Sequence, residues 1–279
     1  IVVIGAGPIG LAAAAHLAAR GQRFLVLRAR LGVGSHVSRW GHVQVFSPWR
    51  YNVDPTARTL LRRAGWVDPD ADALPTGAEL VINYLQPLAK LPDIEPHLRF
   101  GTRVLAVARA GHDKMKTAGR EQAPFEIRIK TSAGEESVLA RAVIDASGTY
   151  GVPNPLGANG LSAIGEDGCR RQIFYGIPDV IGPERARYAG RSVAVVGSGH
   201  SAFNALLDLA QLSTTEPGTA ITWVVRRDDV GAGYGGGAAD ALPARGALGA
   251  RLRALVDAGR IRLVTGFRAA AVERTTETI

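Results

Sequence analysis

The hydrophobic pattern of the chain repeats one arrangement twice: a short apolar run, a glycine-rich turn and a helix-like segment. Residues 1–4 are apolar and lead into a turn at 5–10, and residues 193–196 lead into a second turn at 197–202. In both places another apolar run follows the helix-like segment. Strand, turn, helix and strand in this order predict a βαβ unit, so we expect an α/β protein with two doubly wound parallel-sheet units.

The rest of the pattern predicts further elements around these two units. Apolar residues at helical or alternating spacing predict helices at 11–20, 56–65, 77–91 and 246–258, and strands at 24–27, 103–107, 125–131, 136–139, 142–146, 220–225 and 261–264. The runs at 103–107, 125–131 and 136–139 are separated by turn residues. They predict a small antiparallel β excursion.

Other stretches have no regular pattern. Residues 29–55 hold glycines, prolines and aromatics, which is typical of a functional segment or of a loop held by aromatic packing. Residues 151–190 read as a crossover, and the glycines of 231–237 predict a flexible loop. A short β-prone stretch ends near Glu273. We expect one domain at 1–150, without the C-terminal segment that would return to it, and a second at 151–279.

Composition narrows the class of protein. The 279 residues are 46% hydrophobic, and no apolar run is long enough to predict a membrane span. The chain starts on a strand without Met, and no targeting segment is visible. The single cysteine, Cys169, excludes a disulfide or a Cys-x-x-Cys pair within these residues, which favours a cytoplasmic protein.

The formal charge of +8 comes mostly from scattered arginines. A solvated basic surface is the simplest interpretation, and attraction of anionic cofactors is the second. Nucleic-acid binding ranks below both, because no recognition motif accompanies the charge.

The first glycine turn has the spacing of a Rossmann-like dinucleotide site. Gly5 allows the tight turn, Gly7 lets the backbone approach a diphosphate, and Gly10 lets helix and strand pack closely. The second strand of such a unit normally ends in an acidic residue that binds the ribose, but Arg28 stands there. Arginine has no acceptor, so it would stack on adenine, pair with a phosphate, or indicate a bound 2′-phosphate.

The second turn, from Gly197 to Ala202, is followed by a strand that ends in Arg226 and Arg227. Arginine at this place favours the 2′-phosphate of NADP over NAD, although Asp228 and Asp229 follow at once. His200 and Ser201 start the helix, where capping or phosphate contact is expected.

No other catalytic set emerges from the sequence, and the catalytic residues stay unknown. The six histidines show no metal-ligand spacing with cysteine or carboxylate, so we expect no metal. No Gly-x-Ser-x-Gly nucleophile turn precedes a suitable helix.

These motifs in this order resemble the two-dinucleotide-binding-fold flavoprotein superfamily, and most of all the flavin-containing and Baeyer–Villiger type monooxygenases. Val33-Gly34 followed by Trp40 is similar to a Gly-Gly-x-Trp region, and residues 145–149 resemble an Ala-Thr-Gly hinge. Residues 40–54 resemble a bacterial subgroup of FAD/NAD(P)-binding oxidoreductases. The resemblance covers essentially the whole chain.

The resemblance implies an enzyme that binds FAD at the first turn and NADPH at the second. NADPH would reduce FAD, and a C4a-hydroperoxyflavin would oxygenate a small molecule with O₂. Val104 would contact adenine through its backbone, and Trp40 would lie near the flavin. The residues expected to bind cofactor are Gly5, Ala6, Gly7, Pro8, Ile9, Gly10, Arg28, Gly34, Trp40, Val104, Ser147, Gly148, Gly197, Ser198, Gly199, His200, Ser201, Arg226 and Arg227.

Two departures keep other functions open. In the monooxygenase fingerprint, Phe-x-Gly is followed by three residues and then His, but Val180 stands in that place after Phe174-Tyr175-Gly176. Arg28 replaces the acidic ribose ligand. The alternatives are an FAD-dependent NADPH reductase that passes electrons to a partner or quinone, and a non-catalytic nucleotide-binding module. A homodimer is compatible with each of them.

Overall fold

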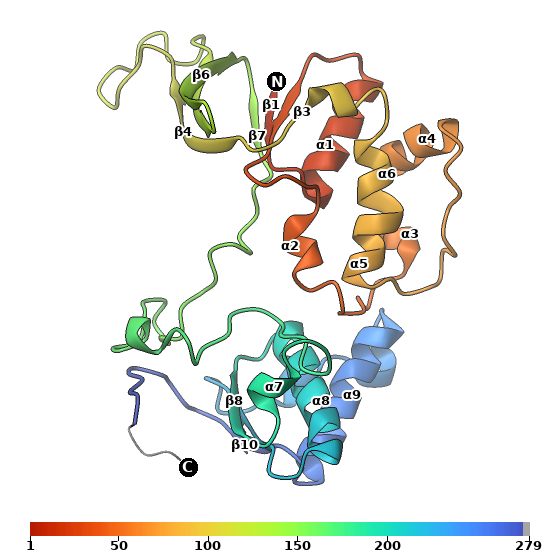
Figure 1. The fold of residues 1–279 in the computed structure, drawn as a ribbon, viewed down its shortest axis with the longest axis vertical. Coiled ribbons are helices and arrows are strands. Elements are labelled where there is room, and N and C mark those ends of the chain that lie inside the picture. The colour runs from red at the N-terminus through yellow and green to blue at the C-terminus, as the bar shows by residue number, and fades with distance from the viewer. Residues whose placement is uncertain (276–279) are drawn as a thin grey trace. The chain divides into compact units, whose positions relative to one another are not determined.

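A computed structural model describes residues 1–275. The chain divides into two compact units, Ile1–Gly151 and Val152–Ile279, and each unit contains parallel strands joined by helices (Figure 1). The predicted α/β class with a small antiparallel sheet is therefore confirmed. The strands are β1 (Val2–Ile4), β2 (Leu25–Leu27), β3 (Leu98–Arg99), β4 (Arg103–Arg109), β5 (Phe125–Thr131), β6 (Gly134–Ala140), β7 (Val143–Asp145), β8 (Ser192–Val196), β9 (Ala220–Val224) and β10 (Arg262–Val264).

Helices of very different length connect these strands. The α-helices are α1 (Pro8–Ala19), α2 (Ser35–Ser38), α3 (Trp49–Asn52), α4 (Pro55–Arg63), α5 (Gly77–Leu80), α6 (Gln86–Ala89), α7 (Arg185–Tyr188), α8 (His200–Thr215) and α9 (Pro243–Asp257). The other helical turns are the π turn η1 (Val81–Leu85) and the 3₁₀ turns η2 (Glu95–His97), η3 (Asp167–Cys169), η4 (Gly231–Tyr234) and η5 (Gly237–Ala239).

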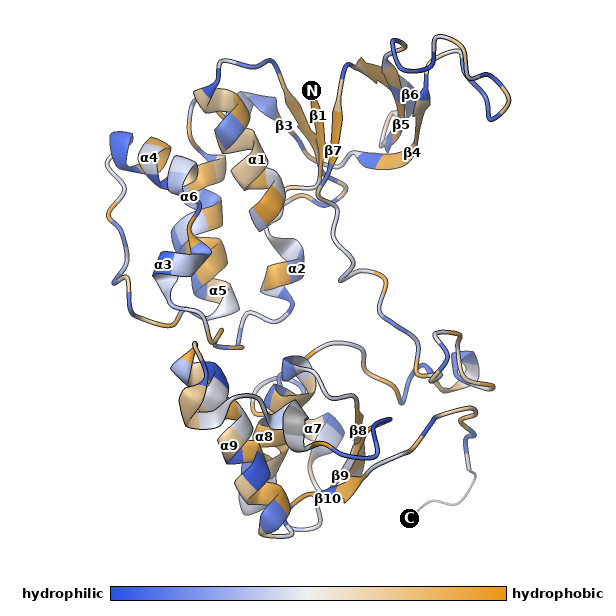
Figure 2. Cartoon of the chain, turned by 180° about the vertical axis from the view of Figure 1, so that it is seen from behind, coloured by the Kyte–Doolittle hydropathy of each residue, from blue (hydrophilic) through white to orange (hydrophobic). Residues whose placement is uncertain are grey.

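The parallel sheet of the first unit has the strand order β3-β2-β1-β7. Successive side chains of a strand point to opposite faces, and here both faces are buried. Val3 and Val26 pack against the helical layer with Leu11 of α1. Val2 and Leu27 point the other way and pack against β5. Figure 2 shows the hydrophobic colour along β1 and β7 that this double burial requires.

The helical layer of this unit is fixed by local signals. Asp54 caps α4, because its Oδ1 accepts the N–H groups of Thr56 and Ala57 at 2.9 Å each. Thr76 and Glu79 form a reciprocal capping box at the start of α5. Both caps satisfy N–H groups that a helix leaves unpaired at its first turn.

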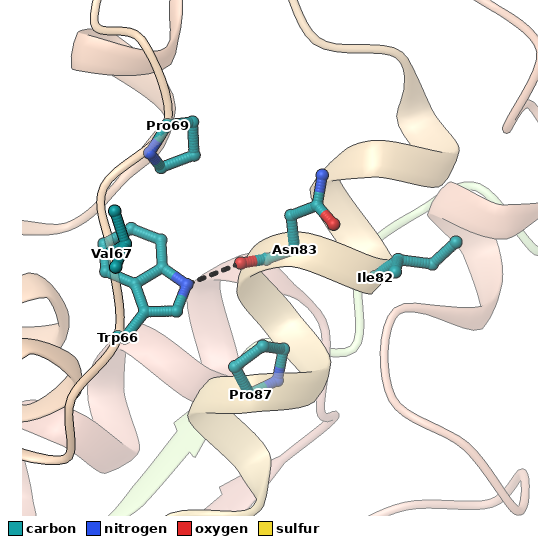
Figure 3. Close-up of a pocket in the computed structure, with 6 residues that line it drawn as sticks. All are labelled: Trp66, Val67, Pro69, Ile82, Asn83 and Pro87. Atoms are coloured by element: carbon teal, nitrogen blue, oxygen red, sulfur yellow. Dashed lines mark hydrogen bonds between the residues drawn. The ribbon is translucent and has the colours of Figure 1, made fainter.

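The predicted helix at 77–91 is present as α5, η1 and α6, but it contains a π turn and Pro87. Proline has no N–H, so it cannot donate to the carbonyl of Asn83 one turn earlier. The indole of Trp66 takes this place, and its Nε1 donates to the Asn83 oxygen at 2.8 Å (Figure 3). Exposed Val67 and Ile82 line the shallow surface hollow beside this bond.

The parallel sheet of the second unit has the order β10-β9-β8 among the residues that the structure describes. Its helices α8 and α9 pack against each other and contribute Phe203, Leu206 and Leu252 to the core. Trp223 of β9 has no exposed surface at the centre of this core.

The structure corrects two predictions about irregular stretches. Residues 29–55 contain the one-turn helices α2 and α3, so this stretch is more regular than expected. Residues 231–237 were predicted as a loop without helical turns, and the structure has two 3₁₀ turns there, η4 and the start of η5. The physical reason is that Gly246 and Gly249 remove side chains from α9, so that the backbone at Gly237 and Tyr234 can lie directly on this helix.

The prediction of a further β-prone stretch near the end of the chain was wrong. The β-prone stretch ending near Glu273 forms no strand among the described residues. It makes one isolated parallel bridge, between Ile164 and Ala271. The backbone N–H of Val272 also donates to Ile164 at 2.8 Å, so the stretch is tied to the crossover segment.

We expect Trp66→Phe to lower the free energy of unfolding by about 1 kcal/mol, because the Asn83 carbonyl loses its indole donor. Urea denaturation measures this loss. In a Pro87→Ala background the restored N–H of residue 87 can donate to the Asn83 carbonyl. Trp66→Phe should therefore lower the free energy of unfolding by less in that background. An equal cost in both backgrounds would show that the bond does not compensate for the proline.

Candidate functional site

The first glycine turn connects β1 to α1, and two of its glycines are required by the protein itself. Gly5 has a φ of +104°, and its N–H donates to the carbonyl of Leu27 at 2.8 Å. A Cβ at Gly5 would lie 2.5 Å from the carbonyl oxygen of Ala146, and a Cβ at Gly10 would overlap the carbonyl oxygen of Gly5. These two glycines therefore let the turn, β7 and α1 approach each other.

Gly7 is different, because nothing in the described structure requires it to be glycine. It precedes α1 with φ −87° and ψ −172°, which any residue adopts, and a Cβ there would meet nothing within 4 Å. The helix begins without a side-chain cap. Open space and uncapped N–H groups at a helix N-terminus are what a diphosphate needs. This part of the site fits a dinucleotide.

The end of β2 does not fit the ribose contact of a usual dinucleotide site. Arg28 is only 9% exposed, and its guanidinium is directed toward the following loop. Its Nε donates to the carbonyl of Gly32 at 2.9 Å, and an Nη donates to the hydroxyl of Ser35. Burial and the neighbouring Arg30 lower the pKa of Arg28. Arg28 therefore holds the loop before α2 in place.

The structure brings some of the other predicted residues of this unit to the turn. The N–H of Gly34 donates to the carbonyl of Ala6 at 3.0 Å. A Cβ on Gly5 would lie 3.1 Å from Cα of Ser147, so the segment after β7 borders the turn. Gly148 has a φ of +70° and open space around it.

Two predicted residues have packing roles in the structure. Trp40 lies against Gly77 at the start of α5, where a Cβ would come within 2.7 Å of the indole. Val104 packs with the core between β2 and β5, at the point where a bulge interrupts β4. Of the turn's remaining residues, Pro8 begins α1 and Ile9 is 72% exposed.

The second turn connects β8 to α8 and is more open than the first. Gly197 has a φ of +126°, and its N–H donates to the carbonyl of Val224 at 3.0 Å. Gly199 has φ −88° and ψ 169°, and a Cβ at either glycine would meet nothing within 4 Å. The helix again starts without a side-chain cap. The geometry fits a second diphosphate.

The sequence did not identify the residue whose side chain supports this turn. The indole Nε1 of buried Trp223 donates to the carbonyl of Gly197 at 2.7 Å. Phe203 and Tyr234 both pack edge-on against this indole, with ring centroids 5.6 and 5.7 Å from it. The aromatic residue in a strand pattern predicted only a core position, so no sequence signal pointed to the hydrogen bond.

An ion pair flanks the same turn. Asp240 is almost fully buried, and its carboxylate receives Nε and an Nη of Arg245 at 2.7 to 3.0 Å. It also accepts the N–H of Leu242 at 2.9 Å. These hydrogen bonds, first of all that from Arg245, lower the pKa of Asp240 from 3.8 to about 2.

His200 lies at the first position of α8, close enough for the charges of Asp240 and Arg245 to affect its pKa. Desolvation and then the charge of Arg245 lower the pKa of His200. The imidazole is therefore neutral near neutral pH, so it offers a phosphate no full charge. Contact through the backbone N–H groups of residues 198–201 is the route that the geometry leaves.

The two arginines after β9 have different surroundings. An Nη of Arg226 donates to the carbonyl of Ala158 at 2.7 Å, which ties β9 to the crossover segment. The side chain of Arg227 is exposed and has no partner among the described residues. Asp229 accepts the N–H of Gly231 at 2.8 Å, so this carboxylate is used in a local turn.

One carboxylate organises the segment that contains Phe174-Tyr175-Gly176, where the monooxygenase histidine is replaced by Val180. Glu166 is buried and accepts the N–H groups of Leu156 and Ala163 and the hydroxyl of Tyr175. Burial and this carboxylate raise the pKa of Tyr175 to about 12. Val180 has no exposed surface and belongs to the core.

Residues 1–275 hold no cluster of His, Cys, Asp and Glu that could bind a metal ion. Within the same part of the chain, no helix is both long and apolar enough to span a membrane.

We expect Gly7→Ala and Gly10→Ala to separate binding from folding. Gly7→Ala should lower unfolding stability by less than about 1 kcal/mol, since the new methyl meets only open space, but it should weaken binding of a dinucleotide. Gly10→Ala should unfold or strongly destabilise the unit. Thermal denaturation and nucleotide titration test both; equal thermal loss in the two variants would contradict this assignment.

The Asp240–Arg245 pair should stabilise the protein above pH 3.8 and lose this contribution as the pH falls through about 2, because folding lowers the pKa of Asp240. We expect the melting temperature of the wild type to exceed that of Asp240→Asn at pH 5, and the difference to shrink toward pH 2. The exposed Asp257, changed to Asn, is the matched control and should show a small difference throughout.

Solved structures with a similar fold include a disulfide reductase and a flavin monooxygenase. Bacillithiol disulfide reductase Bdr (YpdA) from Bacillus cereus is 18% identical with a TM-score of 0.63, over 95% of this chain and 67% of that one. The chain covers 65% of the Staphylococcus aureus reductase. A double mutant of a flavin monooxygenase from Stenotrophomonas maltophilia is 26% identical with a TM-score of 0.52, over 81% of this chain and 57% of that one.

A third similar structure is OTEMO in complex with FAD and NADP, 20% identical with a TM-score of 0.54, over 92% of this chain and 44% of that one. No curated protein matches the sequence significantly. The sequence does match the family described as pyridine nucleotide-disulphide oxidoreductase over residues 2–277. This match confirms the resemblance to two-dinucleotide-fold flavoproteins, and the chain belongs to the pyridine nucleotide-disulphide oxidoreductase family.

Proposed function

We propose that the chain binds FAD at the first glycine turn and NADPH at the second, as part of a flavoprotein oxidoreductase. The observation that carries this proposal is the pair Gly7 and Gly199. Each precedes an uncapped helix in a conformation open to any residue, and each has free space where a side chain would be. Glycine at such a position has no use in folding, but it lets a diphosphate reach the backbone.

The preference for NADPH over NADH rests on Arg227. Its exposed guanidinium follows the second strand of the unit, where a 2′-phosphate on the adenosine ribose would lie. Arg226 is occupied by the carbonyl of Ala158, so we assign Arg227 the main phosphate contact and Arg226 the positioning of the strand end. A charge-assisted contact of this kind contributes roughly 1.5–3 kcal/mol.

When bound, FAD would supply the redox chemistry, accepting a hydride from NADPH and passing electrons onward. The chain's own residues bind and orient the two nucleotides. Gly5 and Gly10 hold α1 against β1, and Trp223 fixes the second turn through the Gly197 carbonyl. These contacts set where each diphosphate can sit before any chemistry occurs.

In finer terms we propose a monooxygenase that acts on a small molecule with O₂. The 26% identity to the Stenotrophomonas maltophilia flavin monooxygenase supports this assignment over 81% of the chain. A reductase that forms a disulfide within this chain is disfavoured, because Cys169 is the only cysteine of the sequence and is buried.

One observation favours a second candidate, an FAD-dependent NADPH reductase that passes electrons to a partner or quinone. The fingerprint position that is histidine in the monooxygenases is Val180 here, and this side chain is fully buried in the core of its unit. It cannot contact a nucleotide. A reductase would need no such residue.

The full-length protein should be yellow when purified or reconstituted, and it should oxidise NADPH with oxygen consumption. With a panel of small nucleophiles and ketones under ¹⁸O₂, a monooxygenase transfers label to product, whereas a reductase oxidises NADPH and leaves organic products unlabelled. Absence of any bound flavin, with no activity after added FAD, would refute the proposal.

Arg227→Ala should raise the KM for NADPH roughly 10- to 100-fold and leave the KM for NADH almost unchanged, because only the 2′-phosphate contact is lost. Steady-state NADPH oxidation measures this. Arg251→Ala removes another exposed arginine of the same unit and is the matched control. An equal effect on both coenzymes would contradict the role given to Arg227.

A further inference from the structure

Three arginines gather beside the first glycine turn: Arg28 at the end of β2, Arg30 in the loop, and Arg39 just after α2. We refer to them as the arginine cluster. All three act on the imidazole of His36, whose pKa is lowered by burial and by each of these charges. No carboxylate among the described residues contributes to that shift. The three positive charges therefore lie close to the same imidazole.

The buried member of the cluster makes the imbalance costly. Arg28 is 9% exposed, yet the partners of its guanidinium are a carbonyl and a hydroxyl, both neutral. A guanidinium has five N–H donors, and these two bonds use two of them. Removing a cation from water without a counter-ion is unfavourable. A bound anion would supply that counter-ion.

The exposed members lack carboxylate partners as well. Arg30 and Arg39 take part in no ion pair within residues 1–275, and Arg39 lies over the ring of Tyr150 at 5.3 Å. Some other surface arginines of this unit do pair with acids, as Arg58 and Arg62 do with Asp68.

The cluster lies where the ribose of a dinucleotide would lie. The carbonyl of Leu27, the residue before Arg28, accepts the N–H of Gly5, and the N–H of Gly34 donates to Ala6. The loop that carries the cluster is therefore bonded to the turn at both of its ends. At the end of this strand a carboxylate binds ribose hydroxyls, whereas a cation binds a phosphate on the ribose.

We propose that the first turn also binds an adenine dinucleotide that carries a phosphate on its adenosine ribose, an NADP-type nucleotide, in competition with FAD. This inference rests on the proposed function, because it assigns a competing ligand to the site given to FAD. Arg30 makes the exposed contact to the ribose phosphate. Arg28 holds the loop and supplies buried positive charge, and Arg39 adds to the field from α2.

The test uses the flavin-free full-length chain with Arg226→Ala and Arg227→Ala, which weaken NADP⁺ binding at the second turn. Equilibrium dialysis with NADP⁺, NAD⁺ and FAD measures the dissociation constants. We expect NADP⁺ to bind at least about 10-fold more tightly than NAD⁺, and FAD to displace it. Adding Arg30→Ala should abolish this preference while FAD binding is retained.

Arg23→Ala is the matched control, because Arg23 is an exposed arginine that precedes β2 at the opposite edge of the sheet. It should leave the preference unchanged. Equal affinity for NADP⁺ and NAD⁺, NADP⁺ that FAD does not displace, or a preference that survives Arg30→Ala would overturn the inference. FAD binding without such competition leaves the proposed function intact, whereas failure of the wild-type chain to bind FAD refutes that function instead.

Discussion

The architecture of the first unit depends on one close approach between backbone atoms. At Gly10 the helix α1 passes so near the carbonyl of Gly5 that no side chain fits between them. The same turn passes close to Ala146 after β7. These contacts place the N-terminus of α1 at the carboxyl ends of β1 and β7, so the strands, helix and candidate diphosphate site share one constraint.

In the second unit, different contacts hold the glycine turn in place. Its turn is open at both Gly197 and Gly199, and a side chain of the neighbouring strand β9 supports it in addition to the backbone bond to Val224. The indole of Trp223 donates to the Gly197 carbonyl, while Phe203 and Tyr234 hold that indole from the side. Similar glycine patterns in a sequence can therefore be supported by different packing.

The sequence predicted the two βαβ units and the small antiparallel sheet, because glycine turns and apolar periodicity are local signals. It failed where a residue's role depends on distant packing. The glycines of 231–237 did not predict the 3₁₀ turns η4 and η5, because the glycines that accommodate this segment lie on α9. Arg28 could be identified as unusual, but the direction of its guanidinium depends on Gly32 and Ser35. The buried carboxylate of Asp240 and its link to His200 likewise had no local signal.

The hydrogen bond from Trp223 has a consequence for how sequence change affects this protein. The same side chain fills the centre of a core and fixes the peptide group beside which a ligand would bind. A substitution at Phe203 or Tyr234, which pack directly against the indole, therefore acts on the position of that peptide group as well. In this unit, selection for a well-packed interior and selection for nucleotide affinity act on the same atoms, so neither property can drift independently.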